Sequence, residues 1–98
     1  MIDMNELQLD EQEYHNNHYA FFGVPIVCTI AFRNAFEEEY EELVSASLRK
    51  LREKYPNKNY DYLQVFHFRD ITFWAIADAH QNERMKDEHV TFLLPSDY

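Results

Sequence analysis

Carboxylates are the reactive side chains that this sequence concentrates most strongly. Glu38, Glu41 and Glu42 fall in a predicted helix, and no Lys or Arg follows any of them three or four residues later. A row of unpaired carboxylates resembles a row of phosphates, and it can compete for a groove that holds Lys and Arg at phosphate spacing. The alternative is a solvated helix start matched to the helix dipole. We expect the same negative field to include the acids of the first segment, Asp10, Glu11 and Glu13.

A metal centre is a second chemistry that the residue types permit. Potential ligands surround a charged loop predicted at 78–88, but the chain contains no HExxH and no Cys-x-x-Cys spacing. A polar loop without a metal or other cofactor is therefore our expectation, and a metal-dependent enzyme stays open as an alternative. The residues concerned are Asp78, His80, Glu83, Asp87 and His89.

Nucleophilic and phosphate-loop chemistry has weaker support. Cys28 lies in an apolar run without a neighbouring base, so a buried structural thiol is expected rather than a nucleophile. The serines lack the glycine pattern of a nucleophile elbow, and a chain with one glycine cannot form a dinucleotide or phosphate loop. We therefore expect a protein that is not an enzyme.

Composition and charge restrict the class of partner. Of the 98 residues, 46% are apolar and 16% aromatic, which is enough to form a hydrophobic core. The chain is too short to form two such cores. The net charge of −9 opposes direct binding to nucleic acid or to an anionic membrane. The longest apolar stretch, 19–32, is too short to cross a bilayer, and no signal peptide is apparent. With a single cysteine, a reducing cytoplasm is the expected location.

The elements that must position these residues follow from periodicity and breakers. An apolar stripe of period 3.6 predicts a helix over 35–55, with Asn34 as N-cap, Glu37 completing a capping box and Pro56 ending it. A helix start as early as Thr29 is also compatible with the sequence. The predicted fold is α+β: an antiparallel sheet of three to five strands with one long helix packed on one face. Strands are predicted at 19–22, 26–31, 60–68, 71–77 and 89–94.

We divide the chain into an acidic N-terminal arm, 1–17, and a single α+β domain, 18–98. The arm carries five acids and no base, and either it frays or its alternating segment 6–10 forms an edge strand. Between 60–68 and 71–77, Arg69-Asp70 predicts a hairpin turn.

Aromatic and apolar side chains alternate onto both faces of the predicted sheet. One helix covers one face, so the second needs the arm, a second copy of the chain or a foreign partner to cover it. Trp74 and Tyr62 are the aromatic residues that we expect to anchor such an interface. A homodimeric structural or regulatory module is thus the main alternative to a foreign partner.

The segments Asp61-Tyr62-Leu63-Gln64-Val65-Phe66 and Thr91-Phe92-Leu93-Leu94-Pro95-Ser96-Asp97-Tyr98 resemble small proteins carried on phages and mobile elements of Gram-positive bacteria. The resemblance covers about a third of the chain, and it implies synthesis inside a bacterial host, with no activity to carry over. Together with the acidic charge, it leads us to expect a phage-type inhibitor of the anti-CRISPR or anti-restriction kind. Such an inhibitor, a possible nucleic-acid mimic, would bind a basic nucleic-acid-handling host protein such as a nuclease.

Overall fold

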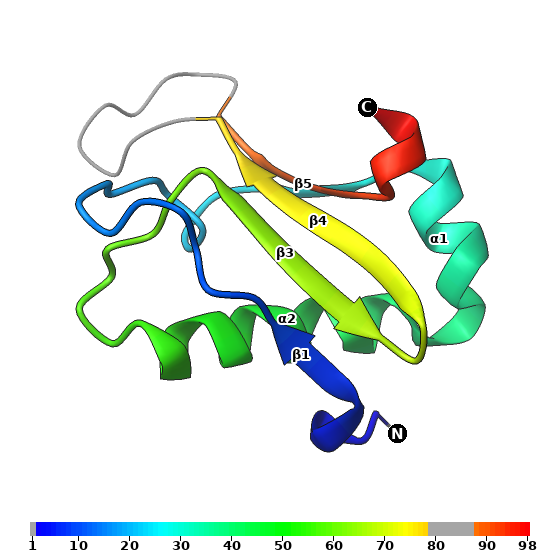
Figure 1. Cartoon of the computed structure of the whole chain (residues 1–98). Helices are drawn as coiled ribbons and strands as arrows, with labels where there is room; N and C mark the ends of the chain where they lie inside the picture. Colours follow the sequence, from blue (N-terminus) through cyan, green and yellow to red (C-terminus); the bar gives the residue numbers. More distant parts are fainter. Residues whose placement is uncertain (1, 79–87) are drawn as a thin grey trace.

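A five-stranded sheet with helices on one face organises the chain (Figure 1), which the computed structural model describes over residues 2–78 and 88–98. The spatial order of the strands is β1-β3-β4-β5-β2. This is the predicted α+β class. The strands are β1 (Leu7–Leu9), β2 (Ile26–Cys28), β3 (Leu63–Phe68), β4 (Ile71–Ala77) and β5 (Val90–Leu93).

The β3–β4 hairpin is the centre of the sheet and forms where the sequence predicts it. The two-residue turn Arg69-Asp70 has positive φ at both positions, 50° and 72°, which is the backbone that matches the twist of a tight hairpin. Residues on the two strands alternate strictly between a buried and a half-buried face. The buried face consists of Gln64, Phe66, Phe68, Phe73, Ala75 and Ala77.

One edge of the sheet departs from the expected antiparallel arrangement. β1, β3, β4 and β5 pair antiparallel, but β2 pairs parallel to β5, with Ile26 opposite Val90 and Cys28 opposite Phe92. The two helices follow β2 and carry the chain away from this edge, so β2 and β5 are free to run in the same direction. The strand predicted at 19–22 is wrong: only Tyr19 bridges to the sheet, by donating its N–H to the Tyr60 carbonyl at 3.0 Å.

The predicted long helix is present but begins earlier and is broken once. α1 (Ile30–Phe36) starts at Thr29, whose hydroxyl accepts the Phe32 N–H at 3.1 Å, so the predicted Asn34 cap is wrong. At Glu37 the backbone reverses to φ 50° and ψ −123°, and a 3-10 turn, η2 (Glu37–Glu39), leads into α2 (Tyr40–Lys54). The early start is favoured because it places two rings, Phe32 and Phe36, one turn apart in the core.

The acidic first segment is tied to the sheet by β1. Of the two predicted behaviours, the edge strand is the one observed: Leu7–Leu9 pairs with Phe66–Phe68, preceded by a 3-10 turn, η1 (Met4–Glu6). Ile2, Leu7 and Leu9 belong to the same buried cluster as the central strands. Among the described residues, no helix is long and apolar enough to cross a membrane.

The break at Glu37 leads to a stability prediction. A residue with a Cβ at φ 50° and ψ −123° is strained, and glycine relieves that strain. We expect Glu37→Gly to raise the free energy of unfolding by about 1 kcal/mol, measured by urea denaturation. Glu38→Gly removes the same charge from helical backbone and should lower stability by about 0.5–1 kcal/mol. Equal effects of both variants would contradict a strained turn.

Candidate functional site

An acidic end lies where α1, η2 and α2 meet the turn of the β3–β4 hairpin. Three contacts show that distant segments gather here: Arg69 binds both Glu39 and Glu6, and Glu42 accepts the backbone N–H of Ile2 at 2.5 Å. Arg33, at the end of α1, and Arg69 are the bases in this region, with Lys50 at its margin. We define the acidic end by its carboxylates: Asp3, Glu6, Glu37, Glu38, Glu39, Glu41, Glu42 and Asp70.

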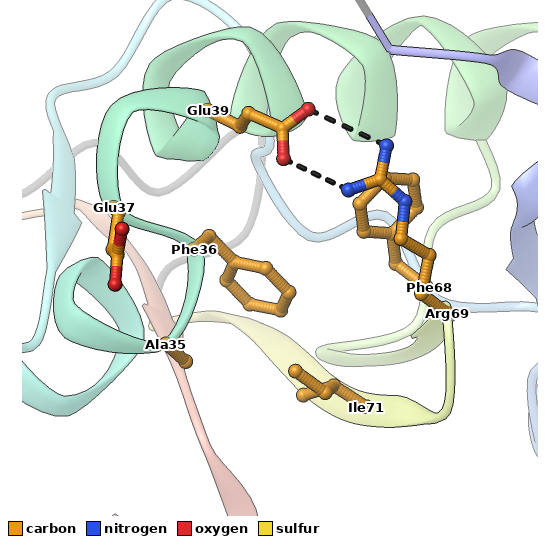
Figure 2. A pocket seen from close by; sticks show the side chains of 7 residues that line it. All are labelled: Ala35, Phe36, Glu37, Glu39, Phe68, Arg69 and Ile71. Atoms are coloured by element: carbon orange, nitrogen blue, oxygen red, sulfur yellow. Dashed lines mark hydrogen bonds and ion pairs between the residues drawn. The ribbon is translucent and has the colours of Figure 1, made fainter.

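Arg69 joins the acidic end to the sheet, and Figure 2 shows its ion pair with Glu39, in which Nη1 donates to Glu39 Oε1 at 2.9 Å. Its Nε lies 3.3 Å from Glu6 Oε2, and its guanidinium stacks on the Phe68 ring. The hydrogen bond to Glu39 is the main cause that raises the pKa of Arg69. Beside it lies an open hollow of about 170 Å³ that includes Ala35, Glu37 and Ile71. Arg69 therefore neutralises two of the acids and leaves the others facing solvent.

Within the acidic end, the three predicted site residues differ in availability. Glu38 and Glu41 are exposed, and in the described part of the chain neither forms an ion pair. Glu42 is also exposed, but its carboxylate holds the Ile2 N–H and thereby the start of the chain. Glu38 and Glu41 are thus the predicted residues best placed to meet a partner.

The predicted acids of the first segment lie elsewhere. Glu11 Oε2 lies 3.5 Å from Lys54 Nζ, at the C-terminal end of α2. Lys54 is thirteen residues from Glu41 along the helix, which corresponds to about 20 Å. Asp10 pairs with His67 at 2.8 Å, and Glu13 is exposed. The structure therefore does not bring the two predicted acidic groups into one surface.

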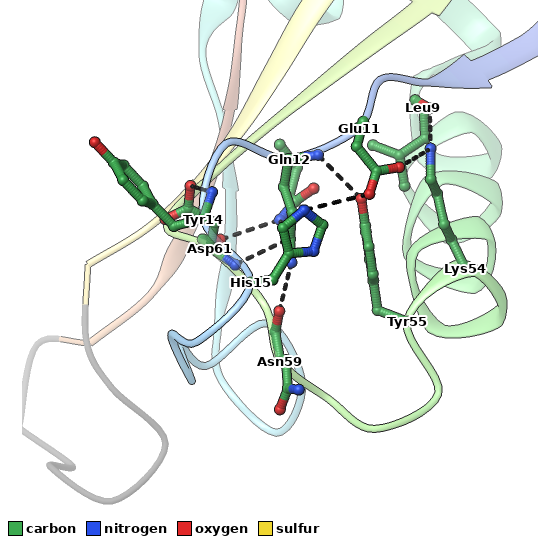
Figure 3. Close-up of polar contacts among 10 residues, drawn as sticks. Leu9, Glu11, Gln12, Tyr14, His15, Lys54, Tyr55, Asn59 and Asp61 are labelled. Atoms are coloured by element: carbon green, nitrogen blue, oxygen red, sulfur yellow. Dashed lines mark hydrogen bonds and ion pairs between the residues drawn. The ribbon is translucent and has the colours of Figure 1, made fainter.

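A buried polar network holds that opposite end together (Figure 3). Gln12 is only 6% exposed; its Oε1 accepts from the Asp61 N–H at 2.9 Å and from Gln64 Nε2 at 2.6 Å, and its Nε2 donates to the Asn59 carbonyl. Its own N–H donates to the Tyr55 hydroxyl. Asp61, also buried, accepts from the N–H groups of Tyr14 and Tyr62 and from the Asn17 amide. This network gives 10–17 a structural role that the sequence analysis missed.

The sheet face opposite the helices carries the other predicted anchor. Trp74 points to this face, where it pairs across the strands with Val65 and Leu93 and contacts the Tyr98 ring at 5.7 Å. The C-terminal 3-10 turn, η3 (Pro95–Asp97), contacts β4 here. We call this surface the open face; its half-buried residues include Leu63, Val65, His67, Thr72, Trp74 and Ile76. Tyr62 does not join it, because it lies at the start of β3 against Tyr19.

A hydroxyl, an imidazole and a carboxylate line up at the edge of the open face. His67 Nδ1 lies 3.0 Å from Thr72 Oγ1, and its Nε2 lies 2.8 Å from Asp10 Oδ2. A hydrogen-bonded series of hydroxyl, imidazole and carboxylate can activate the hydroxyl as a nucleophile. Thr72, however, is the register partner of His67 on the neighbouring strand, which makes their contact an ordinary cross-strand pair. The arrangement joins the segment after β1 to the central hairpin.

The thiol and the proposed metal ligands give no support for catalysis. Burial raises the pKa of the Cys28 thiol, Arg33 lowers it and Glu41 raises it, so the reactive thiolate is disfavoured. Over residues 2–78 and 88–98, no group of three His, Cys, Asp or Glu side chains converges as metal ligands would. His89 pairs with Asp78 at 3.1 Å, whereas His80, Glu83 and Asp87 lie outside the described residues.

Comparison of the chain with protein-family models, with curated proteins and with solved structures gave no match. The functional argument therefore depends on the geometry and charge of this chain.

The buried network at Gln12 leads to a second stability prediction. Gln12→Ala would leave the Asp61 N–H without its acceptor and would remove one of the two acceptors of the Gln64 amide, in a buried place. We expect the free energy of unfolding to fall by about 1–3 kcal/mol, measured by urea denaturation. The matched control is Glu13→Ala at the neighbouring exposed position, which should change it by less than about 0.5 kcal/mol. Similar losses for both variants would show that the network is not what stabilises this end.

Proposed function

We propose that this protein is a small, acidic, non-enzymatic interaction protein of the phage-inhibitor type. Its partner is a basic, nucleic-acid-handling protein of a bacterial host, such as a nuclease, and its contact surface is the acidic end. The observation that carries the proposal is the charge distribution: among residues 2–78 and 88–98, eight carboxylates and two central bases gather where three segments meet, and Arg69 is already paired twice.

The geometry of the acidic end suits a groove that normally holds phosphates. Glu38 and Glu41 lie on consecutive turns at the start of a helical segment, where exposed carboxylates stand about 5 Å apart along the axis. Arg69 pairs with Glu39 and Glu6 and so fixes the turn from which the unpaired Glu38 and Glu41 project. A fixed array of negative charges loses little conformational entropy when a basic groove binds it.

Charge also explains why a basic protein is favoured over nucleic acid or membrane. At a net charge of −9, approach to a polyanion is repulsive, whereas approach to a basic surface is accelerated and becomes dependent on salt. The opposite end of α2 carries Arg49, Arg52 and Lys54, so the field has a direction and would orient the protein during its encounter with the partner.

A homodimer through the open face is the second candidate. It is favoured by one observation: Val65, Trp74 and Ile76 stay partly exposed on a sheet face that no described helix covers. Light scattering at high micromolar concentration distinguishes the homodimer from the inhibitor, because a protein that is monomeric at this concentration cannot act as a homodimer.

Charge reversal at the acidic end tests the proposed function. The double variant Glu38→Lys/Glu41→Lys should weaken capture of basic nucleic-acid-binding proteins from bacterial lysate by at least about tenfold, and inhibition of any captured nuclease should fall in parallel. Glu42 is left unchanged, because its carboxylate holds Ile2. The readout is the bound fraction on the immobilised protein, measured at rising salt.

The control carries the same change of charge at the other end of the molecule. Glu13→Lys/Glu53→Lys also changes the net charge by +4, but Glu53 lies near the C-terminal end of α2 and Glu13 follows Gln12, which donates to Tyr55 just beyond that end. It should retain most of the binding. Equal losses in the two variants would point to net charge alone, and capture that neither salt nor Glu38→Lys/Glu41→Lys reduces would refute the proposal.

A further inference from the structure

The two edge strands of the sheet, β1 and β2, differ in the lysine side chains that contact their backbone. At the β1 edge, Lys50 Nζ donates to the Met4 carbonyl at 3.1 Å and Lys54 Nζ donates to the Leu9 carbonyl at 2.8 Å. Lysine side chains on an edge hinder the addition of a further strand. In the described part of the chain, no Lys or Arg side chain makes a comparable contact to the backbone of β2.

The ladder with β5 determines which backbone groups of β2 are available. Val90 donates its N–H to the Pro25 carbonyl at 2.9 Å, and Thr29 donates to the Phe92 carbonyl at 3.0 Å. In a parallel ladder with this register, Val27 turns both backbone groups toward β5. The N–H and C=O groups of Ile26 and Cys28 therefore point away from β5, toward the outer edge of the sheet, where an added strand can bind them.

The side chains around this edge are apolar and exposed. Ile26 is 37% exposed, Val27 46% and Ile30, at the start of α1, 75%. They lie within 18–32, which carries no formal charge in a chain of net charge −9. An added strand would cover these side chains on both faces of β2, as in recognition by β-strand addition.

Charge next to the edge indicates what kind of strand fits. Asp97 Oδ2 accepts the hydroxyl of Thr29, the residue that follows β2, at 2.8 Å, and Glu41 follows Tyr40, whose ring packs against α1. Arg33 is the nearby base, and it stacks over the Tyr40 ring at 5.2 Å. A second copy of this chain would bring another set of acids to the same place, whereas a segment rich in Lys or Arg would be attracted.

We propose that the β2 edge, Ile26–Cys28, is a docking site for an extended, basic segment of a partner protein. The segment adds as a sixth strand, binds the backbone groups of Ile26 and Cys28, covers Val27 and Ile30, and places Lys or Arg side chains toward Glu38 and Glu41. This rests on the proposed function, because it specifies how the basic partner engages the acidic end.

A short peptide that alternates Lys with Val and Thr is the probe. On titration into the isotope-labelled full chain, the amide signals of Ile26 and Cys28 should shift, and their hydrogen exchange should slow. The same peptide with Glu in place of Lys should bind at least about tenfold more weakly. The Lys peptide with alternate backbone N–H groups methylated keeps its charge but loses its ladder, and it should also bind at least about tenfold more weakly.

Protein variants separate the ladder from the charge. Ile26→Pro removes an outward N–H and leaves the Val90–Pro25 and Thr29–Phe92 hydrogen bonds intact, so it should reduce affinity for the Lys peptide about tenfold. Ile26→Ala keeps the N–H and should bind much more tightly than Ile26→Pro. Glu38→Lys/Glu41→Lys should abolish the preference for Lys over Glu peptides. If Ile26→Pro does not fold, the methylated peptide tests the ladder on the unchanged protein.

Several results would overturn the docking site. One is binding of the Lys peptide that leaves the Ile26 and Cys28 amides unshifted and survives methylation; the acidic end would then act without the edge, and the proposed function would stand. A second is protection of these amides that depends on protein concentration without peptide, which would assign the edge to a homodimer. Failure of the proposed function is separate: no basic protein or peptide would bind at all.

Discussion

The packing of phenylalanine rings between α1 and the sheet is the interaction on which the rest of the structure depends. Phe73 lies at its centre: it stacks on Phe66 at 5.2 Å and contacts Phe32 and Phe36 at 5.3 and 5.4 Å. Phe32 and Phe36 are one turn apart and must both reach the sheet, so α1 has little freedom of rotation. Because α1 is fixed there, the chain needs a sharp reversal at Glu37 before α2 can lie along the same sheet face.

The reversal at Glu37 has consequences for charge as well as for shape. It interrupts the helix at the start of a run of glutamates, and after it Glu38 and Glu41 face solvent while Glu39 faces Arg69. A straight helix would instead have distributed these acids around its axis. The aromatic core and the acidic end are therefore linked by one backbone position, and the charge pattern follows from how the rings pack.

The sequence predicts the elements of this fold better than it predicts their connections. The hairpin strands predicted at 60–68 and 71–77 and the end of α2 follow from alternation, a two-residue turn and Pro56, all of which are local signals, although β3 begins only at Leu63. Of the two helix starts compatible with the sequence, Thr29 is confirmed and Asn34 is wrong, because a capping box is a local pattern that the burial of Phe32 outweighs. The parallel pairing of β2 depends on contacts across more than sixty residues, which no local pattern encodes.

In the candidate site, too, local spacing predicts some features, whereas others depend on how distant elements pack. Glu38 and Glu41 could be found from spacing alone, because the absence of a base at the next turn is visible in the sequence. The separation of Asp10, Glu11 and Glu13 from them could not, since it depends on the direction of β1 relative to α2. The free edge at β2 was also missed, although the uncharged stretch 18–32 was a signal for it.

The pairing of β2 with β5 also determines when the sheet can form during synthesis of the chain. During synthesis, β2 leaves the ribosome long before its neighbour, because residues 26–28 must wait for residues 90–92. Until then one side of the sheet lacks its last strand pair, and the nascent chain exposes the unpaired backbone groups and the apolar side chains of β2. The sheet is thus complete only after β5 has been made, and until then its unpaired strands are exposed to chaperones and proteases.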